Sequence, residues 1–150
     1  MGEKCVLYVS STNYKLVSAG TEKFMSGVID SFKEEGIHSL HFFPLVNINN
    51  KLKKIGIEKS YIGINYDGKF VGTYLLEDMV VAINYIAEKY DLIYDRVIVN
   101  QLHSWNFKKL TKTFETLGLP IILVVHDYMM VCPYMMQKDS DALKCGNCIE

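Results

Sequence analysis

The sequence lacks any run of apolar residues long enough to cross a membrane, and it lacks a strong excess of either charge. A membrane-spanning helix needs about 20 predominantly apolar residues in succession. Here 16 basic and 17 acidic residues leave a formal net charge of −1. Proteins that bind nucleic acid or anionic membranes mainly through charge are usually strongly basic. We therefore expect no membrane span, no nucleic-acid partner and no anionic membrane as the main partner.

The N-terminus lacks the features of a secretory leader. A signal peptide has a basic segment and an apolar core, but here the strand-like residues 5–9 follow almost at once. Four cysteines in a chain without such a leader predict reduced thiols, and we expect a cytoplasmic protein. The length of 150 residues predicts a single domain, and a hydrophobic fraction of 49% is enough for a real core.

Short apolar runs alternate with helical patterns along most of the chain. Together they predict an α/β fold, specifically a Rossmann-like, doubly wound and mainly parallel sheet. The expected strands cover residues 5–9, 37–43, 97–100 and 121–125, and the expected helices cover about 21–35, 75–90 and 104–117.

The middle of the chain departs from this alternation. Residues 44–59 are polar and predict an irregular connection. Asp67-Gly68 then separates two strand-like runs, and such a dipeptide between strands is a strong hairpin signal. We expect an inserted antiparallel hairpin over about residues 60–74, within the sheet or at its edge.

The run Ile121–Val125 and the residues after it are the most informative feature of the sequence. Five apolar, mostly β-branched residues in succession predict a strand buried on both faces. His126, Asp127 and Tyr128 follow directly. In open α/β sheets ligands bind at the carboxyl ends of the strands, so this pair of titratable groups is placed where a binding site is expected.

Two other segments should reach the same edge of a parallel sheet. Ser18-Ala19-Gly20-Thr21 precedes a predicted helix, where free backbone N–H groups and the helix dipole suit a phosphate. The motif alone favours an ordinary loop capped by Thr21, because short glycine-containing loops before helices are common. The second segment is Asn100–Trp105, which contains His103.

Each polar residue at this edge has a functional and a structural interpretation. His103 and His126 can donate hydrogen bonds to a sugar hydroxyl or to developing charge, or they can simply pack or cap. Asp127 can orient an acceptor, act as a weak base or cap a turn. Trp105 and Tyr128 can stack on a sugar face, although helix packing is the simpler interpretation for Trp105.

These residues resemble the N-terminal domain of glycosyltransferase family 4. The resemblance covers essentially the whole chain, and its most specific part is His126-Asp127-Tyr128 followed by Cys132-Pro133. The other matching segments are Ser10, Ser18 to Phe24, Asn100 to His103 and Pro120.

The resemblance implies a GT-B enzyme with two Rossmann-like domains facing a cleft. Such enzymes transfer a sugar from a nucleotide-sugar to an acceptor, mostly with retention and without a catalytic metal. Residues 1–131 would be the acceptor-side domain, with a sugar or lipid-linked acceptor. The resemblance implies that His126 contacts the donor sugar and that the loop of Ala19, Gly20 and Thr21 approaches the donor diphosphate. Together with the residues themselves, it leads us to expect catalysis by His126 and Asp127 and substrate binding by Asn100, His103 and Tyr128.

The chain departs from this family in three respects. Ala19 stands where a first glycine is frequent, and Asn100 stands where a histidine is frequent. The family's C-terminal domain, which carries most nucleotide contacts and a pair of glutamates, would not fit within 150 residues. We expect the chain to be a fragment or one half of a split enzyme, inactive by itself because half of the transition-state contacts are absent.

Residues 132–150 predict an irregular, cysteine-containing tail that leads toward the missing domain. Cys145 and Cys148 have the spacing of zinc ligands, and Cys132 is a third candidate. The alternatives are unpaired thiols and, less in keeping with the pattern, a redox pair. A structural zinc ion is therefore one interpretation, and no cofactor is required for catalysis.

The main alternative function is a non-catalytic α/β module that binds a ligand or a protein, with or without zinc. A receiver domain is disfavoured because Ser10, Ser11, Thr12 and Asn13 stand where its acidic cluster belongs. No Walker loop, serine-hydrolase elbow or complete dinucleotide fingerprint is present. The lysines between Lys51 and Lys59 either attract a phosphorylated or lipid-linked acceptor or form a solvated face, and the solvated face is the simpler interpretation.

Overall fold

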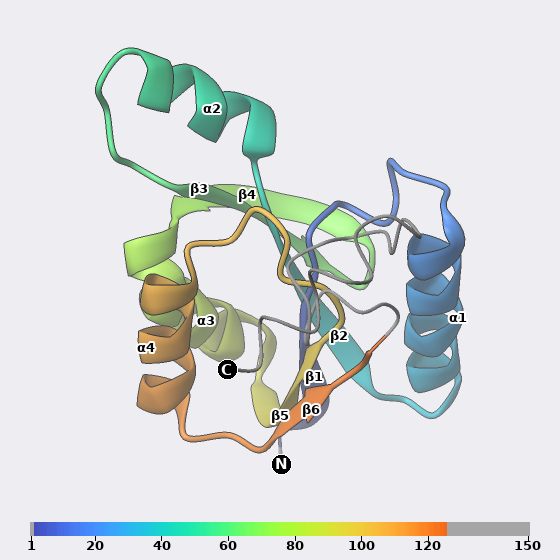
Figure 1. The fold of residues 1–150 in the computed structure, drawn as a ribbon. Helices are drawn as coiled ribbons and strands as arrows, with labels where there is room; N and C mark the ends of the chain where they lie inside the picture. Colours follow the sequence, from blue (N-terminus) through green and yellow to red (C-terminus); the bar gives the residue numbers. More distant parts are fainter. Residues whose placement is uncertain (1, 126–150) are drawn as a thin grey trace, which may run out of the picture.

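The computed structural model describes residues 2–125, which form an α/β fold around one six-stranded mixed sheet (Figure 1). The strands are β1 (Glu3–Val9), β2 (His38–Pro44), β3 (Tyr61–Tyr66), β4 (Lys69–Leu75), β5 (Leu92–Val99) and β6 (Ile121–Leu123). The helices are α1 (Gly20–Glu34), α2 (Val46–Lys54), α3 (Met79–Tyr90) and α4 (Phe107–Leu117), with a 3-10 turn, η1 (Leu76–Asp78), ahead of α3.

The sheet is mainly parallel, as the sequence predicts. Its strand order is β4-β3-β2-β1-β5-β6, and β2, β1, β5 and β6 run parallel to one another. The pairs β2–β3 and β3–β4 are antiparallel. The inserted hairpin therefore forms one edge of the sheet, next to β2.

β1 lies in the middle of the sheet and is buried on both faces. Cys5, Leu7 and Val9 pack into one apolar core with side chains of α3 and α4, while Val6 and Tyr8 pack into a second core with side chains of α1. Figure 1 shows α1 on one side of the sheet and α3 with α4 on the other. Because both faces are covered, the strand reads as a continuous apolar run rather than an alternating one.

The hairpin turn forms as Asp67-Gly68 predicts. Asp67 has φ 47° and Gly68 has φ 78°, and the preferred two-residue hairpin turn needs positive φ at both positions. Within the hairpin, Gly63 gives room to the ring of Phe43, since a Cβ added at Gly63 would lie 2.4 Å from that ring. The turn therefore sets the register of β3 against β4, and the close approach accommodates the pairing of Phe43 in β2 with Gly63 in β3.

Two predictions about local structure were wrong. The expected irregular connection over residues 44–59 contains the helix Val46–Lys54, and no residue of this helix is buried. Asparagines and lysines occupy six of the nine helix positions, and they hid the few apolar residues at helical spacing, Ile48 and Leu52. The helix expected from Ser104 begins at Phe107 instead, because Asn106 is its N-cap and accepts a hydrogen bond from Lys109 N at 3.1 Å.

The prediction that Ile121–Val125 is buried on both faces was also wrong. The strand ends at Leu123, and Ile121, Ile122 and Leu123 are 50%, 41% and 46% exposed. Among the described residues, β6 is the outer strand of the sheet and pairs with β5 alone. The apolar run therefore predicted the strand correctly but not its burial.

Candidate functional site

The candidate site lies at the carboxyl ends of β1 and β5, which are adjacent and parallel. The chain leaves β1 toward α1 on one face of the sheet and leaves β5 toward α4 on the other face (Figure 1). Where neighbouring parallel strands send their connections to opposite faces, a crevice opens between the two loops, and ligands of open α/β proteins bind there. The loop over residues 10–19 and the loop over residues 100–106 leave the sheet at this point.

Hydrogen bonds tie these two loops together. Trp105 Nε1 donates to Ser10 O at 2.8 Å, and Ser11 Oγ donates to the Gln101 side chain at 2.9 Å. Asn100 N–H donates to Val9 O at 2.9 Å and thereby continues the pairing of β5 with β1. These hydrogen bonds hold the two loops in one arrangement at the carboxyl edge of the sheet.

His41 forms the centre of a buried hydrogen-bond network beside the first loop. Its Nε2 lies 2.7 Å from Ser10 Oγ, and its Nδ1 lies 3.4 Å from Asn65 Nδ2. The Ser10 hydroxyl donates to Thr12 O at 2.7 Å, so Ser10 Oγ accepts from Nε2–H and Nδ1 accepts from Asn65. Asn65 Nδ2 also donates to Asn13 Oδ1 at 2.9 Å. The network thus assigns one neutral tautomer to His41.

Burial keeps His41 neutral. It is 1% exposed, and burial lowers its pKa from 6.5 to about 3. The rings of Tyr8, Tyr14 and Phe43 surround it, with centroids 6.5, 5.1 and 5.2 Å away. Since both ring nitrogens are engaged, His41 is a positioning residue that orders the loop after β1.

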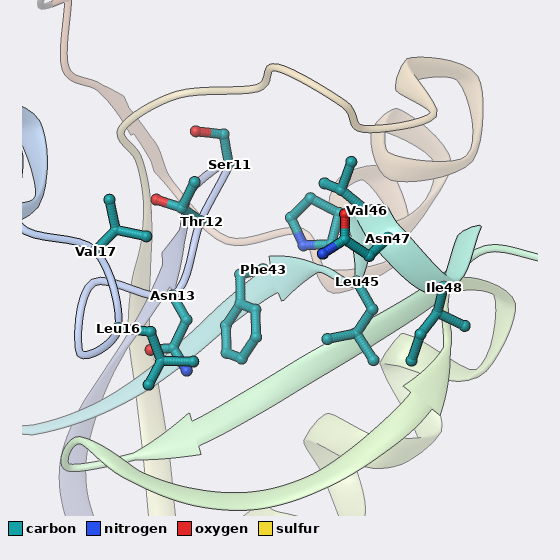
Figure 2. Close-up of a pocket in the computed structure, with 11 residues that line it drawn as sticks. Ser11, Thr12, Asn13, Leu16, Val17, Phe43, Leu45, Val46, Asn47 and Ile48 are labelled. Atoms are coloured by element: carbon teal, nitrogen blue, oxygen red, sulfur yellow. The ribbon is translucent and has the colours of Figure 1, made fainter. Parts of the chain in front are cut away.

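A pocket of about 410 Å³ opens between this loop and the end of β2 (Figure 2). Phe43 and Leu45 lie on one side, and Leu16 and Val17 lie across from them. Most of the lining side chains are apolar, while Ser11, Thr12, Asn13 and Asn47 supply polar groups. Such a mixture suits a ligand with a large apolar surface and a few hydroxyls.

A second pocket, of about 310 Å³, lies against the first turn of α1. Lys15, Ser18 and Lys23 contribute to its lining, together with Glu22. Glu22 is 7% exposed, and its carboxylate accepts a hydrogen bond from Thr12 Oγ1 at 2.5 Å. The pocket therefore combines two cations with one carboxylate that already accepts a hydrogen bond from the neighbouring loop, and it adjoins the helix N-terminus.

The predicted donor-phosphate residues lie at this helix N-terminus. Ala19, not Thr21, is the N-cap of α1, and no side-chain hydrogen bond caps the helix. Gly20 is the first residue of the helix, and a Cβ added there would meet nothing within 4 Å. The fold does not require a glycine at this position, and the backbone of Gly20 carries no side chain that would separate it from a molecule in the adjoining space.

The predicted residues after β5 lie in different surroundings. Asn100 is 2% exposed at the end of the strand, whereas His103 is exposed. Trp105 is 7% exposed and packs in the core on the α3 and α4 side, so its indole is a structural link and does not stack on a ligand. The structure therefore brings Asn100 close to the first loop and leaves His103 free to contact a ligand.

The remaining predicted site residues lie outside the described residues. These are the predicted catalytic residues His126 and Asp127, the predicted substrate-binding residue Tyr128, and the candidate zinc ligands Cys132, Cys145 and Cys148. Their roles remain predictions. Within residues 2–125, no group of three or more histidine, cysteine or acidic side chains could hold a metal ion.

A search of the described helices for a membrane span found none that is both long enough and apolar enough. Comparisons of the chain with protein-family models, with curated proteins and with solved structures found no match.

Sequence reasoning missed His41 and Asn65, which order the first loop. A signal was present, because the strand 38–44 carries a histidine among apolar residues, and a buried polar side chain needs a partner. The partners could not be inferred, since Ser10 and Asn65 are 31 and 24 residues away in the sequence.

Proposed function

We propose that the chain is the Rossmann-like, acceptor-side domain of a GT-B glycosyltransferase of the family 4 kind. In the reaction, the anomeric carbon of a nucleotide-sugar exchanges its bond to the diphosphate oxygen for a bond to an acceptor oxygen. The proton of the acceptor hydroxyl leaves with the nucleoside diphosphate in the net reaction. Retention of configuration and independence of a catalytic metal are part of this proposal.

The observation that carries the proposal is the pair of adjacent pockets at one carboxyl edge. The pocket at α1 is lined by Lys15 and Lys23 and adjoins the N-terminus of the helix, and both features suit a diphosphate. The neighbouring pocket between Phe43 and Val17 is larger and mainly apolar, and it suits an acceptor. Leu16 and Val17 line both pockets, so a ligand in one would adjoin a ligand in the other.

In this proposal the predicted catalytic residues, His126 and Asp127, act at the same edge of the sheet as the two pockets. His126 and Asp127 follow β6, whose carboxyl end lies on the same edge of the sheet as the ends of β1 and β5. His103 and Asn100 would hold substrate hydroxyls from the loop after β5. A partner domain would supply the nucleotide contacts, so the chain alone is expected to bind a donor weakly and not to turn over.

Replacement of Gly20 tests donor binding without disturbing the fold. Gly20→Ala places a methyl group where the diphosphate would approach the first turn of α1, and we expect about tenfold weaker binding. The measurement is an NMR titration of the isotopically labelled chain with a panel of nucleoside diphosphate sugars. In the parent chain, the amide signals of Gly20 and Thr21 should shift.

Gly27→Ala is the matched control, since Gly27 is in the same helix and an added Cβ there also meets nothing within 4 Å. Both variants should melt no lower than the parent, because alanine favours a helix over glycine. Shifts confined to other parts of the chain, or equal binding by Gly20→Ala and the parent, would contradict the donor site. They would favour the alternative of a non-catalytic binding module.

A further inference from the structure

The helix α2 exposes an apolar stripe that covers no part of the core. Ile48 and Leu52 are four residues apart, so they lie on one face of the helix, and Ile55 follows as its C-cap residue. Ile48 is 47% exposed and Ile55 is 71% exposed, and no residue of the helix is buried. Figure 1 shows α2 standing away from the other helices, beyond the carboxyl edge of the sheet.

The same segment is strongly basic although the whole chain is not. Lys51, Lys53, Lys54 and Lys59 are all exposed, and Glu58 is the single acidic residue between Val46 and Ser60. A net charge of −1 for the chain therefore conceals a local excess of positive charge. We call Ile48, Ile55 and the three lysines of the helix the α2 surface.

Further apolar side chains and further lysines lie next to the α2 surface. Leu16, which is 82% exposed, and Val17 line the apolar pocket that Val46 and Ile48 also line. On the other side of α2, a pocket of about 450 Å³ is lined by Lys53, Lys59 and Lys109, among others. Apolar side chains and cations thus lie next to each other along this edge of the molecule.

We propose that the α2 surface docks the chain onto an anionic lipid bilayer. An amphipathic helix with exposed isoleucines and flanking lysines lies in the interface with its apolar side chains among the acyl chains and its cations at the headgroups. Charge complementarity selects the anionic bilayer among apolar partners, because the α2 surface carries three lysines beside its isoleucines. The inference is independent of sugar transfer, since docking requires neither donor nor acceptor.

Vesicle co-sedimentation tests this inference with the full chain. Vesicles of equal parts phosphatidylcholine and phosphatidylglycerol should bind the chain, and vesicles of phosphatidylcholine alone should bind it far less. The triple variant with Lys51, Lys53 and Lys54 each changed to Gln should bind the anionic vesicles on the order of a hundredfold more weakly. Added sodium chloride should weaken the binding of the parent.

The control triple variant changes Lys33, Lys89 and Lys112 to Gln. These residues are exposed on α1, α3 and α4, so the change in net charge is the same, and binding should remain close to that of the parent. Ile55→Gln should weaken binding about tenfold, since it removes an apolar side chain from the interface. Val81→Gln is its control, because Val81 is 67% exposed on α3.

Three results would overturn the inference: no binding to either vesicle, equal binding to both, and equal losses in the two lysine variants. Inorganic phosphate separates a bilayer from a free anion. If it displaces the chain more effectively than sodium chloride of the same ionic strength, the lysines form a phosphate pocket instead of a docking surface. The NMR titration with nucleoside diphosphate sugars, read at the Gly20 amide, does not depend on any of these outcomes. It therefore tests the proposed function separately.

Discussion

Trp105→Ala is expected to lower the free energy of unfolding by about 3–5 kcal/mol, the usual cost of deleting a buried aromatic side chain. Trp105 is 7% exposed, and its Nε1 donates to Ser10 O at 2.8 Å. The variant therefore leaves a cavity in the core and also removes a bond between the two loops of the candidate site. Urea unfolding followed by circular dichroism measures the loss.

Two further variants separate packing from hydrogen bonding at this position. Trp105→Phe keeps most of the ring and loses the Nε1 donor, so it should cost about 1 kcal/mol plus a smaller cavity term. Phe107→Ala removes an aromatic ring that is 55% exposed and should change stability by less than about 0.5 kcal/mol. If Trp105→Ala and Phe107→Ala have equal effects, the link between the two loops does not contribute to stability as described.

Acidification is expected to destabilise the protein steeply because His41 resists protonation. Burial lowers the pKa of His41 from 6.5 to about 3, so the unfolded chain binds a proton more readily than the folded chain between these values. Stability from this residue is complete above about pH 6.5 and declines as the pH falls toward 3. The slope approaches about 1.4 kcal/mol per pH unit, and unfolding curves across this window measure it.

Histidine variants identify the source of this acid sensitivity. His41→Phe should flatten the slope relative to the parent, although it costs about 1–3 kcal/mol at neutral pH because Ser10 and Asn65 lose their partner. His38→Gln should leave the acid slope unchanged, and it serves as the control. An unchanged slope in His41→Phe would contradict the neutral, buried tautomer.

His38 is a suitable control because its pKa is raised, so its contribution to stability changes above pH 6.5 and not in the acid range. Burial alone would lower its pKa, but the hydrogen bond and charge of Asp67, with those of Glu3, raise it above 6.5. Its ring nitrogens lie 2.6 Å from Asp67 Oδ2 and 2.8 Å from Glu3 Oε2. Its contribution is complete below pH 6.5 and is lost as the pH rises through its raised pKa.

The predictable part of the fold follows from local signals. β1 could be predicted because a strand covered on both faces is apolar throughout, and the hairpin because Asp67 and Gly68 tolerate positive φ. α2 could not be predicted in the same way, since none of its residues enters the core. The apolar run at Ile121–Leu123 indicated a strand but not its exposure, because neighbours in the sheet are a tertiary property.

In the candidate site, too, local features could be predicted from the sequence and tertiary contacts could not. The sequence predicts that the loops after β1 and β5 meet, because parallel strands end at one edge. It does not predict that Trp105 and Ser11 join them, because these bonds connect residues 95 and 90 positions apart. Likewise, the phosphate motif indicated Gly20 correctly as a loop-to-helix junction, but only the backbone geometry shows that Ala19 is the N-cap.

Sugar transfer is the most direct test of the central claim. The reading frame beyond Glu150, or a companion gene, should encode a second α/β domain. The complete protein should release a nucleoside diphosphate from at least one nucleotide-sugar as a glycosylated acceptor forms. Residues 1–150 alone should show no transfer, and His126→Ala in the complete protein should abolish most of it. Transfer by residues 1–150 alone, or no transfer by the complete protein with any donor, would contradict the account.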